Sequence, residues 1–156
     1  MSQKQEIVIA KHFIDATKKV LNTMAFADPV AGAPYSPKNN TMNGDISAII
    51  GVTGACTGTI SVSFSREAAL TVLRGMLGDD IENPDQEAAD AVGEIINMVS
   101  GMARASLAES GLSMQGSTPS VVSGKNHTLK HQSNAPVVAI PFSLGESSFT
   151  VEFSLK

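Results

Sequence analysis

The first periodic stretch of the chain covers residues 6–27. Within it, apolar residues recur at the three- and four-residue spacing of a helix with one buried side; they are Ala10, Phe13, Ile14, Val20, Leu21 and Met24. The Asp28-Pro29 pair should end this helix, because the residue before a proline is pushed out of the α region. A proline-containing loop is expected from 28 to 44.

Two β-strands are predicted next. Residues 46–52 form an apolar run typical of a buried strand, and residues 59–64 alternate between apolar and polar side chains. Gly54 and Gly58 bracket the connection between them. The pattern therefore predicts an antiparallel hairpin.

Two helices are predicted after this hairpin. Ser65 is placed to cap a short helix over 66–77, which Gly78 would end. Asn83 is placed to cap a longer one, with Pro84 in its first turn and Gln86 completing a capping box. That helix should reach Ser110, with Gly111 as its stop, and measure about 40 Å.

The last third of the chain is predicted to be rich in strands. Segments 118–123 and 126–130 are expected to pair across Gly124-Lys125, and segments 136–144 and 147–155 to form a second hairpin. Pro141 cannot donate to a β-ladder, so its strand should lie at an edge or carry a bulge there.

The order of elements suggests an internal repeat. Each half has a long helix, a loop and a hairpin, and segment 61–65 (SVSFS) is similar to segment 150–154 (TVEFS). We therefore predict one α/β (α+β) domain over 1–156, with an antiparallel β-sheet packed by two long helices.

Composition narrows the classes of function. Hydrophobic residues make up 42% of the chain and charged residues 17%, which is typical of a globular protein. The net charge of −4 argues against a nucleic-acid-binding protein. A single cysteine, Cys56, excludes an internal disulfide framework. No apolar run suits a signal peptide or a membrane span, so a cytoplasmic location without a membrane partner is expected.

Several common catalytic patterns are missing from the sequence. There is no Gly-x-Ser-x-Gly motif and no phosphate-binding Gly-x4-Gly-Lys-Ser/Thr loop. His12, His127 and His131 are scattered, and the last two would share a face in a helix, whereas their segment is predicted to be a strand. We therefore expect neither a metal site nor a cofactor of the protein's own.

The long helix predicted over 83–110 carries a polar stripe opposite its apolar side. Asp90, Glu94, Asn97 and Gly101 lie on this stripe, and Glu94 and Asn97 are neighbours because they are three residues apart. A glycine in mid-helix costs about 1 kcal/mol relative to alanine. Gly101 is therefore expected to let another surface approach the helix, although an exposed Glu and Asn alone are usually only solvated.

The pattern Asp90-x3-Glu94-x2-Asn97, followed at a distance by Pro119, resembles the signature of the CheC/CheX/FliY phosphatases of bacterial chemotaxis. Segments 44–54, 58–64, 67–69, 76–78 and 91–98 also resemble that family, and the similarity covers most of residues 6–155.

Two departures from the family pattern bear on its details. The first helix carries Asp15-x3-Lys19-x2-Asn22, in which a lysine replaces the acidic residue, so this copy is degenerate and the chain is most similar to the CheX-like branch. Pro119 is one residue closer to Asn97 than the family's proline usually is. Either the loop over 111–116 has lost one residue, or Pro119 is not the equivalent proline.

The resemblance implies an enzyme that hydrolyses the aspartyl phosphate of a phosphorylated CheY-like response regulator. Asn97 would position the attacking water and Glu94 would engage a lysine of the regulator, while Asp90, Met98 and Gly101 would contact the partner. The Mg²⁺ ion would belong to the regulator, and the protein would form a homodimer through its sheets. A non-catalytic module that binds a response regulator or a flagellar-switch component is the alternative, and the intact Glu94/Asn97 pair favours the enzyme.

Overall fold

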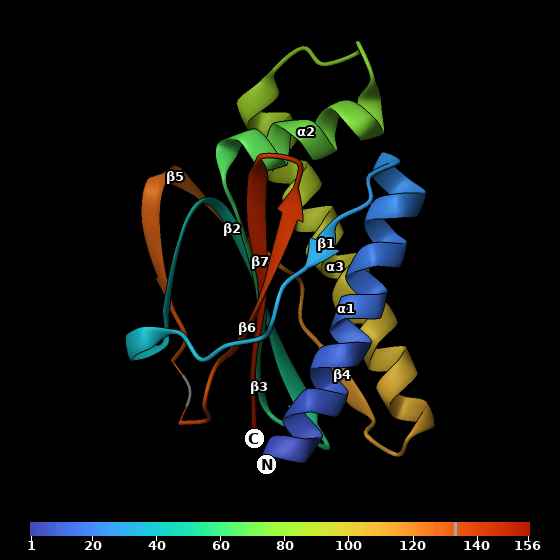
Figure 1. Ribbon diagram of the computed structural model, residues 1–156, viewed down its shortest axis with the longest axis vertical. Helices are drawn as coiled ribbons and strands as arrows, with labels where there is room; N and C mark the ends of the chain where they lie inside the picture. Colours follow the sequence, from blue (N-terminus) through green and yellow to red (C-terminus); the bar gives the residue numbers. More distant parts are fainter. Residues whose placement is uncertain (133) are drawn as a thin grey trace.

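The computed structural model describes residues 1–132 and 134–156 and contains a seven-stranded antiparallel sheet with helices on one face (Figure 1). The helices are α1 (Gln3–Ala25), α2 (Arg66–Leu77) and α3 (Pro84–Glu109), with a short 3₁₀ helix, η1 (Lys38–Asn40). The strands are β1 (Val30–Ala31), β2 (Thr41–Gly54), β3 (Gly58–Phe64), β4 (Met114–Gly116), β5 (Ser120–Lys130), β6 (Val138–Leu144) and β7 (Ser147–Leu155).

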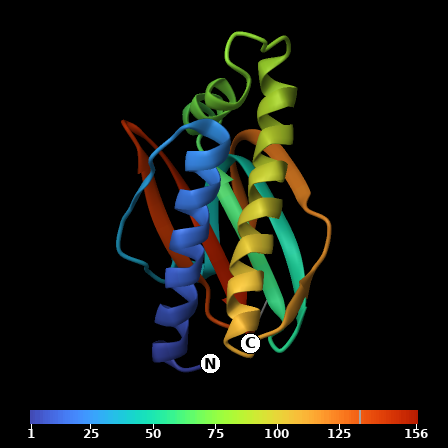
Figure 2. The ribbon, with the colours of Figure 1, turned by 90° about the vertical axis from the view of Figure 1, so that its right-hand side faces the viewer.

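Helices α1 and α3 lie side by side and run in opposite directions across the sheet (Figure 2). Their apolar sides and the facing side of the sheet form one continuous core. Within it, the rings of Phe13 and Phe153 stack with their centroids 5.2 Å apart. At the surface, His12 Nδ1 lies 2.9 Å from Ser106 Oγ and joins the two helices. The predicted α+β fold, an antiparallel sheet packed by two long helices, is confirmed.

The strands follow the order β1-β6-β7-β3-β2-β4, and β5 also pairs with β2. The hairpins β2–β3 and β6–β7, both predicted, meet at the centre of the sheet, where Val62 faces Val151 in register. This arrangement of two similar hairpins about one central pair fits the predicted internal repeat.

The ends of α1 differ from the prediction. The helix begins at Gln3 rather than at residue 6, because Ser2 and Gln5 form a capping box there. It ends at Ala25, before the Asp28-Pro29 pair, since Phe26 adopts a left-handed conformation with φ of 52°. Phe26 is also 86% exposed.

Of the caps predicted for the other two helices, those of α2 form and the one at the start of α3 does not. Ser65 Oγ accepts a hydrogen bond from the Ala68 N–H at 3.1 Å, and Gly78 ends α2 with φ of 62°, as predicted. The capping box at Asn83 and Gln86 is wrong, because the Asn83 side chain makes no capping bond. Instead, the Glu87 carboxylate accepts the backbone N–H of Asn83 at 2.9 Å.

The predicted hairpin over 118–130 is also wrong. Strand β5 is continuous and pairs with β2, which is longer than the predicted strand over 46–52. The register shifts at Asp45, whose carboxylate accepts the backbone N–H groups of Asn126 and Arg66, each at 2.8 Å. These hydrogen bonds hold the pKa of Asp45 below its usual value.

The predicted loop over 28–44 contains β1, η1 and the start of β2. After β1 the chain crosses to the side of the sheet away from the helices (Figure 1). The carbonyl of Pro141, in β6, accepts a hydrogen bond from the Gly32 N–H at 2.7 Å. The proline nitrogen, which carries no hydrogen, therefore also points toward β1, which pairs with β6 over only two residues. No helix among the described residues is long and apolar enough to cross a membrane.

Candidate functional site

The polar stripe of α3 lies on the outer side of the helix, as the periodicity predicts. Asp90, Glu94 and Asn97 are exposed, whereas the residues that face the sheet are buried; these are Val92, Ile95, Ile96 and Val99. Within the described parts of the chain, no hydrogen bond or ion pair involves Glu94 or Asn97. Both polar groups are therefore available to a partner or to water.

The other predicted contact residues have different surroundings. Asp90 Oδ1 accepts a hydrogen bond from Gln86 Nε2 at 3.1 Å. A Cβ atom added at Gly101 would meet nothing within 4 Å, so the helix surface there is open. Met98 is half-buried and packs against the core, which leaves only part of its side chain on the stripe.

The start of β5 forms a wall beside this stripe. A Cβ atom added at Gly93 would lie 3.1 Å from Val121 Cγ2, so the helix and the strand are in contact there. Asn97 lies four residues after Gly93, or about 6 Å along α3. Pro119 lies two residues before Val121, or about 6.6 Å along the strand in the same direction. The structure therefore brings Pro119 to the level of Asn97.

The degenerate copy of the motif lies on the neighbouring helix. Asp15, Lys19 and Asn22 are exposed on α1. The contact between His12 and Ser106 marks one level that α1 and α3 share. From it, Asn22 lies about 15 Å along α1 and Asn97 about 14 Å along α3, so the two asparagines are at nearly the same level.

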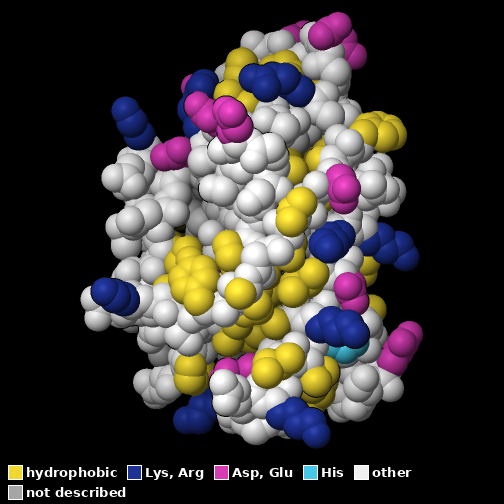
Figure 3. All heavy atoms as spheres, in the orientation of Figure 1, with side chains coloured by type: hydrophobic (Ala, Val, Ile, Leu, Met, Phe, Trp, Pro, Cys, Tyr) yellow, Lys and Arg dark blue, Asp and Glu magenta, His cyan; other side chains and the backbone are white. Residues whose placement is uncertain are grey.

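Neither of two hollows in the surface includes the stripe. One, of about 690 Å³, lies near the start of α3 between Asp45, Arg66, Asp85 and Lys125. The other, of about 440 Å³, lies between α1 and the segment that follows β1, where hydrophobic side chains gather in the space-filling view (Figure 3). Glu94 and Asn97 lie on open helix surface, which suits contact with a macromolecule better than enclosure of a small molecule.

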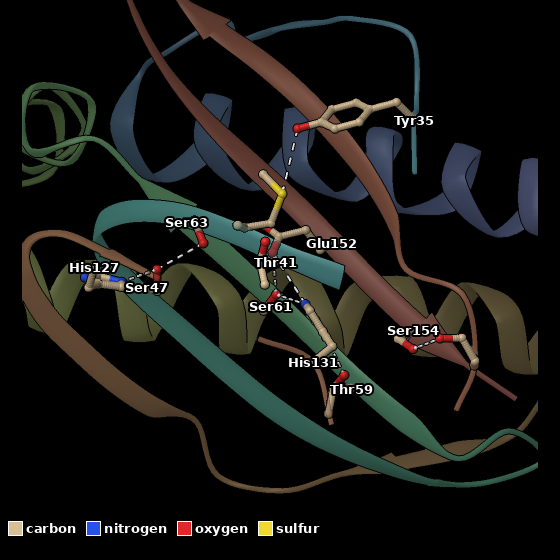
Figure 4. Close-up of polar contacts among 12 residues, drawn as sticks. Tyr35, Thr41, Ser47, Thr59, Ser61, Ser63, His127, His131, Glu152 and Ser154 are labelled. Carbon is tan, nitrogen blue, oxygen red and sulfur yellow. Dashed lines mark hydrogen bonds and ion pairs between the residues drawn. The ribbon is translucent and has the colours of Figure 1, made fainter. Parts of the chain in front are cut away.

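A second group of polar residues, which the sequence did not reveal, lies on the sheet face away from the helices (Figure 4). His131 Nδ1 lies 2.7 Å from Thr59 Oγ1, and His131 Nε2 lies 3.0 Å from Ser61 Oγ. The Ser61 hydroxyl donates to Glu152 Oε1 at 3.1 Å, and Glu152 Oε2 has no partner. Burial of the carboxyl raises the pKa of Glu152 above its usual value.

This buried cluster is not a hydrolytic triad. Ser61 and Glu152 have no exposed surface, so no substrate can reach the hydroxyl. The serine and the carboxylate also meet the same imidazole nitrogen, whereas a triad places them on opposite nitrogens. Among the residues that the structure describes, no three of His, Cys, Asp or Glu come together as a metal site.

The inference that His127 and His131 would share a face only in a helix is wrong. A strand also places residues four apart on one face, and both rings face the sheet, with His127 Nε2 lying 2.7 Å from Ser47 Oγ. The sequence pattern does not single out Glu152, because this residue alternates with the core residues Val151 and Phe153 of β7. The short polar side chains on the neighbouring strand, Ser61 opposite Glu152 and Thr59 opposite Ser154, are the signal that a second layer covers this face.

Comparison with known proteins identifies the family. The family described as "Chemotaxis phosphatase CheX" matches residues 46–143. The CheY-P phosphatase CheX of Thermotoga maritima is 29% identical over 150 residues, which cover 95% of this chain and 96% of that protein.

Solved structures agree with this assignment. The crystal structure of a CheX chemotaxis protein from Desulfovibrio desulfuricans is 51% identical, with a TM-score of 0.90, over 95% of this chain and 99% of that one. CheX of Borrelia burgdorferi, solved as a CheX–CheY–BeF3–Mg²⁺ complex, is 22% identical with a TM-score of 0.73 over 94% and 97% of the chains, and shows the fold alone. The chain belongs to the CheX family of chemotaxis phosphatases.

Proposed function

We propose that this protein accelerates hydrolysis of the aspartyl phosphate on a phosphorylated CheY-like response regulator. The observation that carries the proposal is the pair of exposed, uncommitted side chains, Glu94 and Asn97, on one face of α3 in a chain of the CheX family. The relative from Thermotoga maritima, similar over nearly its whole length, is a CheY-P phosphatase and supports the same substrate.

Asn97 positions the attacking water in this proposal. An acyl phosphate needs no covalent nucleophile from the phosphatase, so rate enhancement comes from holding water in line with the phosphorus. A carboxamide offers a donor and an acceptor to one water molecule. Because Asn97 has no intramolecular partner among the described residues, binding water there breaks no existing hydrogen bond.

Glu94 sets the register of docking. Its exposed carboxylate lies one helical turn from Asn97 and forms a charge-assisted pair with a lysine beside the regulator's phosphate. The regulator contributes its own Mg²⁺ ion, which balances charge on the phosphoryl group. Asp90, Gly101 and the exposed part of Met98 complete the docking surface around the pair.

The proposal includes a homodimer joined through sheet edges and a cytoplasmic location. Strand β5 supports the first point, since one of its edges is paired with β2 and most of its residues are exposed. The alternative function is a module that binds a regulator or a flagellar-switch component without catalysis, and it needs neither side chain to be free.

A dephosphorylation time course distinguishes these functions. A phosphorylated CheY-like regulator is followed with and without catalytic amounts of the protein, under conditions where the regulator also decays alone. The enzyme should convert many regulator molecules per copy and shorten the decay. If decay is unchanged while the two proteins still form a complex, the binding module is correct.

A further inference from the structure

Arg104 joins α3 to the segment that leads into β5. It lies seven residues after Asn97, which places it two helical turns further along the same side of α3. Its side chain is half-buried and leaves the stripe: Nε donates to Ser100 Oγ at 3.0 Å and Nη1 donates to the Met114 carbonyl at 3.4 Å. The charged end therefore bridges the helix and strand β4.

The guanidinium also covers Gly116. A Cβ atom added at Gly116 would lie 2.9 Å from Arg104 Cζ and 2.9 Å from Nη2, so the arginine rests directly on this glycine. Gly116 is paired with Val52 of β2 on its other side. The end of β4 is thus held between the sheet and the arginine of the helix.

Ser117, the next residue in the chain, forms two hydrogen bonds with the sheet. The Ser117 N–H donates to the Gly51 carbonyl at 2.8 Å, and the Gly51 N–H donates to Ser117 Oγ at 2.9 Å. Pro119 and Val121, which form the wall beside the stripe, follow Ser117 closely in the chain. Arg104 ties the start of this segment to α3 by a hydrogen bond, and Val121 packs against Gly93 of the same helix further along the segment.

We infer that Arg104 is a positioning residue for the docking face: it holds segment 114–121 against α3, so that Pro119 and Val121 stand in a fixed place beside Glu94 and Asn97. This inference rests on the proposed function, because its consequence is measured on the regulator. Ordering a loose segment when a partner binds costs conformational entropy for each side chain that becomes immobilised. Losing the contact should therefore weaken docking more than it slows the chemical step.

Two independent substitutions displace the arginine. Arg104→Met keeps the apolar stem and removes the N–H donors. Gly116→Ala leaves Arg104 intact, but its new Cβ overlaps the guanidinium and must push this flexible end aside. Gly124→Ala is the matched control, since a Cβ added at that glycine of β5 meets nothing within 4 Å.

For each variant, KM and kcat are measured with a phosphorylated CheY-like regulator, together with a melting curve and amide hydrogen exchange of segment 114–121. Both test variants should exchange faster there and raise KM about tenfold, with kcat within about twofold of the original. Gly124→Ala should change none of these. A purely structural role would lower the melting temperature and leave KM unchanged, and that result in the two folded variants overturns the inference.

The assay separates this inference from the proposed function. If the unaltered protein does not accelerate decay of the regulator, the proposed function fails, and the positioning role fails with it. If the unaltered protein is active and both variants keep its KM, only the role of Arg104 is overturned.

Discussion

Asn97 and Glu94 lie three residues apart on α3, but the proposed mechanism gives them different kinetic effects. Asn97 acts only while water attacks, so Asn97→Ala should lower kcat about a hundredfold, or about 3 kcal/mol, and leave regulator binding nearly unchanged. Asn22→Ala is the matched control, because Asn22 is an exposed asparagine at a similar level on α1. Decay of the phosphorylated regulator at saturating enzyme measures the effect. Full turnover in folded Asn97→Ala would rule out the water-positioning role.

Glu94→Ala should impair both docking and turnover. The carboxylate pairs with a cation of the regulator in the encounter and in the bound complex, so its loss affects affinity as well as rate. Titration of the complex and decay at subsaturating enzyme measure the two effects separately. Glu109→Ala, an exposed glutamate at the end of α3, serves as the control. Neither change should alter the melting temperature appreciably, because both side chains are exposed.

The buried carboxyl of Glu152 leads to a prediction about stability rather than activity. Burial raises the pKa of its carboxyl in the folded protein, so the folded state holds a proton that the unfolded chain loses. Stability from this group is complete below the unfolded pKa of about 4.3 and declines as pH rises toward the folded pKa. Glu152→Gln cannot titrate and should lack this decline.

The measurement is the free energy of unfolding from pH 4 upward for the original protein and for Glu152→Gln. The difference between the two should shift in favour of the glutamine variant as pH rises. Glu146→Gln, at an exposed glutamate in the β6–β7 turn, controls for charge alone. Parallel pH profiles for all three proteins would contradict the raised pKa.

At the scale of the helices, two glycines should respond in opposite ways to the same change. Gly101→Ala adds a methyl group into open space on α3 and should stabilise the protein by about 0.5–1 kcal/mol, since alanine favours helix. Gly75→Ala should destabilise it, because the new Cβ would lie 2.0 Å from the Ala25 carbonyl oxygen, where α2 meets α1. Thermal melting of both variants tests the pair, and equal shifts would contradict it.

The elements that periodicity predicted turn one apolar side toward the core. Helix α3 and the hairpins β2–β3 and β6–β7 place apolar side chains on that side at regular intervals, so their apolar spacing carries the information. The stripe with Glu94 and Asn97 followed from the same spacing, since it is the side of α3 that the core leaves uncovered. The roles of Glu94 and Asn97 came from the resemblance to a family, because helical periodicity shows only the direction in which side chains point.

The elements that the sequence did not predict depend on distant contacts. Strand β5 is exposed along most of its length, so it has no apolar period, and its course follows β2 and the Asp45 carboxylate. The His131–Glu152 contact joins residues 21 positions apart. Arg104 meets Met114 only after α3 ends and the chain turns back. None of these leaves a local signal.

At the scale of the whole molecule, the sheet separates two different surfaces. One face carries the core, with α1 and α3 outside it, and the outer sides of these helices hold both copies of the motif (Figure 2). The other face carries the buried polar cluster beneath the segment that crosses from β1 to β2. A regulator docked on α3 therefore leaves the free edges of the sheet available for a second copy of the chain.

The free edge of β5 is the better of the two for a homodimer. Strand β1, at the other end of the sheet, has only two residues, whereas β5 has 11. The first part of β5 carries no charge, and Val122, which is 43% exposed, points away from the side where Val121 meets α3. An uncharged edge strand can pair with a second chain, while a lysine on such an edge opposes pairing.

Light scattering at micromolar concentration should therefore give a mass near twice 16.2 kDa. Val122→Lys should shift the protein toward the monomer, because each dimer would bring two added charges to one edge. Val30→Lys is the matched control, since Val30 is an exposed valine on β1, at the opposite end of the sheet. It should leave the mass unchanged. A monomeric unaltered protein would contradict the dimer itself, and a dimer lost only in Val30→Lys would move the interface to β1.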